Sequence, residues 1–336
     1  MNSRFKYSLL GLCITIFALT GYSQAAFAET VLKVSHQWPG GTGDIRDEMV
    51  RVLARAVEAE DVDLTLRIYP GQSLLKAGDQ WSALVRGRVD IIALPLDYAS
   101  GRHPQFNATL MPGLVRDHNH ARRLNDSAFI TEIKSIIEKA GALVIADAWL
   151  AGGFVSNKQC ILWPDDIKGQ VTRGAGPAFE RMLVGAGASI TSMPSSEIYT
   201  ALQTGVLDAA NTSAASFDSY RIYEQVKCYT APGEHALWFM YEPVMISKQR
   251  WDRLNDAQRS ALMRAGDAAE AYFAKASRDL DEQVENTFRK AGVQVVYMNA
   301  DQAAAWRAIA QKSAYDVFAR EVDEGAGLIQ KALAVE

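Results

Sequence analysis

The chain has 336 residues, of which 49% are hydrophobic, and a formal net charge of −4 at pH 7. It contains no basic stripe and no arginine-rich run, which argues against a nucleic-acid partner. The length allows a sizeable core and predicts two domains.

Residues 1–28 have the features of a secretory signal peptide. Basic residues precede an apolar run at 7–19, and small residues stand at 26 and 28, so we predict cleavage after Ala28. The run is shorter than the roughly 20 apolar residues that cross a bilayer, which makes a retained anchor the weaker alternative. Cys13 follows a leucine inside the run and does not suit a lipoprotein. We therefore expect a periplasmic protein that starts at Glu29.

The remaining chain alternates short apolar strands with helical stretches, which predicts an α/β fold with largely parallel sheets. A strand at 31–36, a helix at 44–59 and a strand at 63–69 begin the pattern. The elements that follow a turn at 69–72 are a helix at 79–86 and strands at 89–94, 143–148, 170–172 and 293–298.

A single very long helix is predicted for residues 256–291. The segment has no proline, one internal glycine and apolar residues at helical spacing. At 1.5 Å per residue it would be about 50 Å long, more than one small domain accommodates. It is either one helix across two lobes or a kinked pair of ordinary helices.

Two cysteines remain after processing, Cys160 and Cys228. An oxidising periplasm permits a disulfide between them, and two free buried thiols are the alternative.

Catalytic and metal-binding motifs are missing from the sequence. His118 and His120 lack nearby carboxylate or cysteine partners and indicate a solvated turn, so we predict no metal and no cofactor. The glycine-rich run at 40–43 is either a loop facing a ligand or a plain tight turn. A rival interpretation is an exported enzyme that uses His36 or His235 as its base, but no paired acid and base support it.

Two longer motifs identify a family. Residues 163–173 read WPDDIKGQVTR, and residues 193–211 read MPSSEIYTALQTGVLDAAN. Together with YPGQ at 69–72, GRVD at 87–90, LMPG at 110–113 and WDRL at 251–254, they resemble the solute-binding subunits of tripartite ATP-independent periplasmic (TRAP) transporters, of the C4-dicarboxylate-binding type. The resemblance covers nearly all of the mature chain.

The resemblance implies a two-lobed periplasmic binding protein fold, with hinge strands and a long helix that spans the lobes. Lobe I would comprise 29–150 and about 241–280, and lobe II 151–240 and about 281–336. The ligand would lie between them. Arg173 ends a D-x-x-G-x-x-x-R motif whose arginine clamps the ligand carboxylate in this family; a surface salt bridge is the alternative.

Asn211 ends the second motif, where relatives use an asparagine to hydrogen-bond the ligand. A turn asparagine is the alternative role. Thr212 adds a hydroxyl contact or caps the next segment, and Ser195 occupies a place that often faces the ligand.

The chain departs from the family pattern at one informative place. Relatives carry a second arginine near 152–153, but no arginine occurs between Ala146 and Asn157. Loss of that charge favours a monocarboxylate with an apolar or aromatic body, such as an aryl or branched 2-oxo or 2-hydroxy acid. The predicted ligand-binding set is therefore Arg173, Asn211, Ser195, Thr212, His36 and the aromatic residues Trp38, Trp149, Phe154, Trp238 and Phe239.

The function implied by the resemblance is capture of a small organic acid and delivery to a TRAP membrane permease. We expect a monomer that is not an enzyme. A sensor-input protein that presents its ligand to a receptor is a further alternative.

Overall fold

The computed structural model describes residues 29–336. The predicted signal peptide and its cleavage after Ala28 lie outside the described residues.

The first lobe is built on a five-stranded sheet with the order β2-β1-β3-β11-β4. β1 lies between β2 and β3 and is parallel to both, whereas β11 is antiparallel to β3 and β4. The strands are β1 (Thr30–Ser35), β2 (Leu64–Tyr69), β3 (Ile91–Ala93), β4 (Ala142–Ala146) and β11 (Val244–Ser247). Helices α1 (Ile45–Glu58), α2 (Gln80–Val85), α3 (His118–Asn125), α4 (Ala128–Lys139) and α8 (Lys248–Trp251) accompany them.

The second lobe is built on a seven-stranded sheet, in which the order is β12-β9-β5-β8-β6-β7 and β10 also pairs with β5. Its strands are β5 (Trp149–Ser156), β6 (Val171–Gly174), β7 (Ser189–Ser192), β8 (Ala209–Ser213), β9 (Cys228–Ala231), β10 (Trp238–Tyr241) and β12 (Gln294–Tyr297). The helices of this part are α5 (Pro177–Gly185), α6 (Ile198–Gln203), α7 (Ala214–Ser219), α10 (Ala300–Ala310) and α11 (Asp316–Glu321).

The chain passes between the sheets at two strand connections. β4 leads into β5, and β10 leads back into β11. Each sheet has one strand that runs against the others, β11 in the first and β5 in the second, so the expectation of largely parallel sheets is confirmed. The expected α/β fold with two lobes is confirmed.

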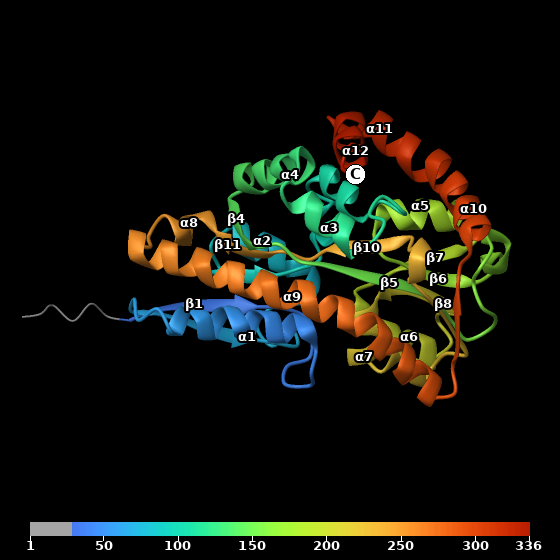
Figure 1. Cartoon of the computed structure of the whole chain (residues 1–336), viewed down its shortest axis with the longest axis horizontal. Helices are drawn as coiled ribbons and strands as arrows, with labels where there is room; N and C mark the ends of the chain where they lie inside the picture. Colours follow the sequence, from blue (N-terminus) through green and yellow to red (C-terminus); the bar gives the residue numbers. More distant parts are fainter. Residues whose placement is uncertain (1–28) are drawn as a thin grey trace, which may run out of the picture.

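One continuous helix, α9 (Asp256–Lys290), links the lobes, so the alternative of a kinked pair is wrong. Asn255 and Gln258 form a capping box that satisfies backbone N–H groups at its start. Figure 1 shows α9 extending from the end of the molecule that holds β1 and α1 to the end that holds α6 and α7. Its internal Gly266 lies so close to β4 that an added Cβ would be 2.1 Å from the carbonyl oxygen of Ile145.

The C-terminal helix α12 (Gly325–Leu333) packs on α4, in the part of the chain predicted as lobe I, although α10 and α11 accompany the second sheet. Figure 1 shows the C-terminus near α3 and α4. Lys331 pairs with Glu132, and Arg116 donates to the backbone oxygen of Val335 at 3.0 Å. The C-terminus is thus attached to the first lobe.

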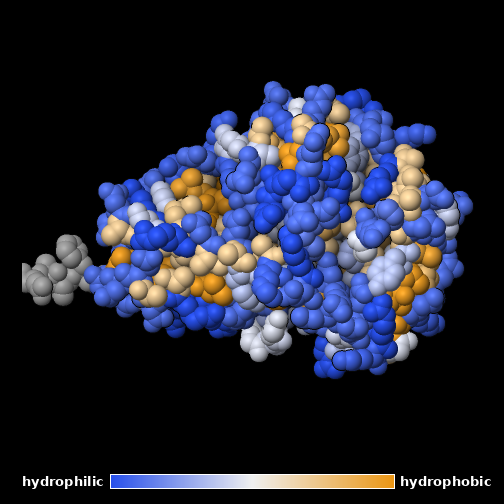
Figure 2. Space-filling model, viewed as in Figure 1, coloured by the Kyte–Doolittle hydropathy of each residue, from blue (hydrophilic) through white to orange (hydrophobic). Residues whose placement is uncertain are grey.

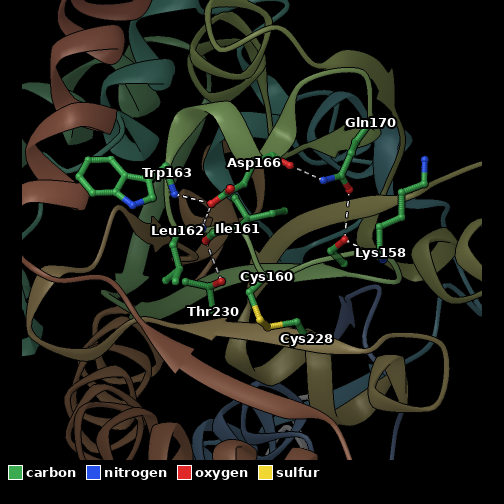
Figure 3. Close-up of a disulfide and its surroundings, with 10 residues drawn as sticks. Lys158, Cys160, Ile161, Leu162, Trp163, Asp166, Gln170, Cys228 and Thr230 are labelled. Carbon is green, nitrogen blue, oxygen red and sulfur yellow. Dashed lines mark hydrogen bonds between the residues drawn. A yellow bond between two sulfur atoms is a disulfide. The ribbon is translucent and has the colours of Figure 1, made fainter.

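Cys160 and Cys228 form a disulfide with Cα atoms 5.1 Å apart (Figure 3). Cys160 follows β5 and Cys228 begins β9, the strand beside it. Thr230 supports the same connection, because its hydroxyl donates to the carbonyl oxygen of Ile161 at 2.8 Å.

The face of the molecule shown in Figure 2 is mainly hydrophilic, with hydrophobic residues in separate groups. Within residues 29–336, no helix is both long enough and apolar enough to cross a membrane.

Candidate ligand-binding cleft

Several strands end at the boundary between the two lobes. The segment after β1 carries His36 and Trp38, the segment after β3 carries Asp97 and Tyr98, and Arg173 lies near the end of β6. Ligands of open α/β sheets commonly bind at the carboxyl ends of parallel strands. The topology therefore brings polar residues of both lobes to one cleft.

The Arg173 side chain contacts residues of both lobes at this cleft and is only 1% exposed. Its Nε donates to the carbonyl oxygen of Met193 at 3.0 Å, and its Nη1 donates to the carbonyl oxygen of Asn211 at 2.8 Å. Its Nη2 donates to the Tyr98 hydroxyl of the first lobe at 3.3 Å. These bonds fix the guanidinium and leave a second N–H on each terminal nitrogen.

Arg173 has no carboxylate within salt-bridge distance among the residues that the structure describes. Burying a guanidinium without a direct ionic partner is costly. The position of Arg173 is therefore suited to an external anion.

A cavity of about 360 Å³ adjoins Arg173. Asp97 and Tyr98 contribute to it from the first lobe, whereas Pro177, Met193 and Pro194 contribute from the second. The polar side chains of the wall are those of Asp97, Tyr98, Arg173, Glu180 and Ser192, and the rest of the lining is glycine, proline and methionine.

Two buried carboxyl groups belong to the cleft, Asp97 close to Arg173 and Glu242 close to Arg46. Burial raises the pKa of Asp97 to about 7, although the Arg173 charge opposes this rise. Burial likewise raises the pKa of Glu242 to about 8, with Arg46 opposing and Asp44 and Asp97 contributing. Both groups therefore change charge near neutral pH.

Arg46 is a second buried arginine in the cleft and is 0% exposed. It forms a bidentate pair with Asp44 at 3.0 and 2.8 Å, and its Nη1 lies 3.6 Å from Glu242. The same nitrogen donates to the hydroxyls of Ser213 and Ser216 in the second lobe at 3.2 and 3.0 Å. Burial lowers the pKa of Arg46, but the charges of Asp44 and Glu242 outweigh it, and the group stays cationic.

Further hydrogen bonds between the lobes close the cleft. The Ser195 N–H donates to the Tyr98 hydroxyl at 3.1 Å, and the Tyr220 hydroxyl donates to the carbonyl oxygen of Gln37 at 3.2 Å. The structure is thus a closed form of the two lobes.

Asn211, Thr212 and Ser195 were predicted from the sequence, and all three are buried. Asn211 contacts Arg173 directly, Thr212 follows it on β8, and Ser195 binds the same Tyr98 hydroxyl as Arg173. The Asn211 carbonyl oxygen binds Arg173, whereas both polar atoms of its side-chain amide have no partner among the described residues. That amide is available to a ligand.

His36 and Trp38 lie next to Arg46. The His36 ring stacks on Trp38 with centroids 5.4 Å apart, and the Arg46 guanidinium lies 4.7 Å from the Trp38 ring centroid. His36 Nε2 lies 3.1 Å from Asp47, which also accepts the N–H of Gly41 at 3.0 Å. The exposed glycine run at 40–43 is therefore held as a turn against the start of α1.

Trp149 and Phe239 lie elsewhere. Trp149 donates to Asn125 at 2.8 Å and lines another cavity of about 720 Å³ between α3, α4 and α9. Phe239 packs with its ring centroid 5.1 Å from that of His118. The structure does not bring these two rings to the Arg173 cavity.

Phe154 and Trp238 belong to a hydrophobic core of the second lobe. Phe154 stacks on Trp306 with ring centroids 5.4 Å apart, which explains its burial by packing. Trp238 is fully buried, but its indole N–H has no partner among the described residues.

The missing second arginine has a steric explanation. An added Cβ would be 2.0 Å from the carbonyl oxygen of Thr212 at Gly152 and 2.1 Å from that of Thr230 at Gly153. Because any side chain at either position would displace a neighbouring strand, this arrangement of β5 requires glycine.

The expectation of a solvated turn at His118 and His120 is wrong. His118 begins α3 and lies 2.8 Å from Asp281, while His120 is buried and accepts the N–H of Arg116 at 3.2 Å. Within residues 29–336, no group of three or more His, Cys, Asp or Glu side chains is arranged to hold a metal.

Sequence reasoning missed Asp97, Tyr98, Arg46 and Glu242. Glu242 interrupts the apolar stretch 236–246, and Asp97 follows a predicted strand. Each position was a detectable signal, because an isolated charge next to a buried strand requires a partner.

Comparison with known proteins decides the family. The model of the bacterial extracellular solute-binding proteins, family 7, matches residues 35–321. The chain belongs to this family. A solute-binding protein of Albidiferax ferrireducens is 40% identical over 295 residues, with 86% of this chain and 87% of the relative covered. The C4-dicarboxylate-binding periplasmic protein of Rhodobacter capsulatus is 26% identical and covers 90% of this chain and 91% of its own.

A solved TRAP periplasmic solute-binding protein from Rhodoferax ferrireducens, with bound malonate, has a TM-score of 0.87 and 38% identity, and the match covers 90% of this chain and 96% of the other. A Bordetella pertussis solute receptor that binds pyroglutamic acid has a TM-score of 0.82 at 21% identity, covering 90% and 99%, and shows the shared fold. The solute-binding protein described here is therefore a TRAP subunit of the C4-dicarboxylate-binding type, from a family of periplasmic receptors.

Proposed function

We propose that this solute-binding protein captures a small monocarboxylate between its lobes and delivers it to a TRAP membrane permease. The main support for this proposal is Arg173. It is buried, each of its terminal nitrogens has an N–H that makes no hydrogen bond to the described chain, and no carboxylate of that chain lies within salt-bridge distance. A planar guanidinium matches a carboxylate with two parallel hydrogen bonds and keeps its charge when desolvated.

No second unpaired arginine lies in the cleft of residues 29–336, which supports one ligand carboxylate rather than two. Arg46 is neutralised by Asp44, and positions 152 and 153 hold glycine. A second ligand carboxylate would meet Asp97 or Glu242 rather than a cation. Pro177, Met193 and Pro194 give the cavity wall apolar surface, which favours an apolar or aromatic ligand body.

The proposed cycle has an open form that admits the ligand and a closed form that docks on the permease. The two strand connections, β4 to β5 and β10 to β11, would be the hinge between lobe I (29–150 and about 241–280) and lobe II (151–240 and about 281–336), with the C-terminal helix α12 of the latter range packed on lobe I. We propose a monomer that performs no chemistry. Turnover of a bound acid would contradict this. The base in such a reaction would be His36, which is buried beside Asp47.

A thermal-shift screen of the mature protein tests the ligand class, because a ligand that binds only the folded state raises the melting temperature. Matched monocarboxylates and dicarboxylates, aliphatic and aromatic, form the panel. We expect shifts with monocarboxylates that have an apolar or aromatic body. Shifts with dicarboxylates alone would refute the proposal.

A further inference from the structure

Some buried acceptors in the cleft have no hydrogen-bond donor. Asp97 is 3% exposed, and neither of its carboxyl oxygens has a partner among the described residues. Glu242 is 1% exposed, and its Oε2 is unpartnered in the same way. Buried polar atoms in native proteins are nearly always satisfied, so these oxygens are suited to a donor from a bound ligand.

Asp97 faces the Arg173 cavity. It lines that cavity with Tyr98 and Arg173, and its Oδ2 would lie 2.6 Å from a Cβ added at Gly176. The glycine thus leaves the carboxyl group room at the boundary of the two lobes. Glu242 lies close enough for its charge to act on Asp97, on the side of Arg46.

The charges in the cleft define what a ligand must bring. Arg46 is matched by Asp44 at 2.8 Å, and Arg173 would be matched by the ligand carboxylate. The ionised Asp97 then remains as an acceptor without a salt-bridge partner in the described chain, whereas Glu242 shares Arg46 at 3.6 Å and keeps one unpartnered oxygen. An oxo oxygen or a second carboxylate at this place would meet these acceptors with a lone pair, whereas an O–H or N–H would donate to them.

We propose that Asp97, assisted by Glu242, selects carboxylates that carry an O–H or N–H donor near the carboxylate, namely 2-hydroxy acids, 2-amino acids or lactam acids. This inference rests on the proposed function, because Arg173 must first orient the carboxylate. Among the ligands that fit the pocket, the proposal predicts tighter binding of 2-hydroxy acids than of 2-oxo acids. Asp97 is thus a specificity residue and Arg173 the anchor.

Isothermal titration calorimetry with matched acids at about pH 8.5, where Asp97 is ionised and has no O–H to donate, tests the proposal. The probes are mandelate, phenylglyoxylate and phenylacetate, the corresponding set lactate, pyruvate and propionate, and phenylglycine and pyroglutamate as N–H donors. We expect at least one donor-bearing acid to bind 10-fold or more tighter than its oxo and unsubstituted analogues. Asp97→Asn should reduce that ratio to below 3-fold, because an amide can also donate to an oxo group.

Glu180→Gln is the matched control. Glu180 lines the same cavity and its charge acts on Asp97, but its carboxylate already accepts a hydrogen bond from Ser192 and so offers a ligand donor less than Asp97 does. It should change all affinities in one set by a common factor and leave the ratio intact. Glu242→Gln provides a second test if Asp97→Asn does not fold, as judged by circular dichroism, and should also reduce the ratio.

The outcomes separate the two proposals. If oxo and unsubstituted acids bind wild type as tightly as their donor-bearing analogues, or if Glu180→Gln lowers the ratio as much as Asp97→Asn, the role of Asp97 is refuted while monocarboxylate capture stands. If no monocarboxylate binds, the proposed function fails first.

Discussion

Asp97 should make the unliganded protein less stable as pH rises. Its pKa is about 7 in the folded protein and 3.8 when exposed, so the folded state retains a proton that the unfolded state has lost between these values. The group therefore contributes no penalty below pH 4, and the free energy of unfolding falls as pH rises from 4 to above 7. A difference of this size corresponds to about 4 kcal/mol at most.

Asp97→Asn removes this penalty and should gain stability relative to wild type by about 2 to 4 kcal/mol between pH 4 and pH 8. Denaturant unfolding of both proteins at each pH gives the difference and cancels the titrating groups that do not interact with Asp97. Glu242 does interact, because the Asp97 charge helps to raise its pKa, and its change adds to the gain of the variant in the same direction. Burial lowers the pKa of His120, so this group makes the free energy of unfolding rise with pH, and it does so equally in both proteins. A stability difference that stays constant between pH 4 and pH 8 would refute the burial of an ionising Asp97.

Three further changes test the framework. The double variant Cys160→Ser/Cys228→Ser opens a cross-link over 68 residues and should lose about 4 kcal/mol of unfolding free energy in urea titrations while retaining ligand binding; unchanged stability would contradict the bond. Gly266→Ala forces a methyl group against the Ile145 carbonyl and should lower the free energy of unfolding by about 1 to 3 kcal/mol. Gly101→Ala is the control, because nothing lies within 4 Å of the added methyl group, and it should cost little. Equal effects would exclude the close approach of α9 to β4. Arg46→Met leaves Asp44 and Glu242 without their cation and should lower stability by about 3 to 5 kcal/mol at pH 8, and a neutral result in thermal unfolding would show that the cluster is solvated.

The sequence predicted the elements that have strong periodicity. The long helix was expected at 256–291 and is found at Asp256–Lys290, because its apolar spacing, its cap and the absence of proline agree with one another. β5, by contrast, was not among the predicted strands. Its adjacent glycines at 152 and 153 weaken strand propensity, and their reason is a close approach of neighbouring strands that only the tertiary structure reveals.

The candidate site was predictable where a motif fixes it and not where distant segments meet. Arg173 and Asn211 belong to the two long motifs and lie together in the cleft. Phe154 was expected at the ligand but packs on Trp306, a partner more than a hundred residues away along the chain. Arg46 of the first lobe binds Ser213 and Ser216 of the second, 167 and 170 residues further along the chain, so no local pattern could associate them.

The most direct test of the account is the affinity of the mature protein for its best monocarboxylate before and after Arg173→Ala, measured by isothermal titration calorimetry. Arg181→Ala is the control, because Arg181 is an exposed arginine on α5 that pairs with Glu321 at 3.1 Å. Removal of the buried anchor should weaken binding by at least about 100-fold, while the control stays near wild type. Binding that survives Arg173→Ala in a folded protein would contradict a carboxylate site at Arg173.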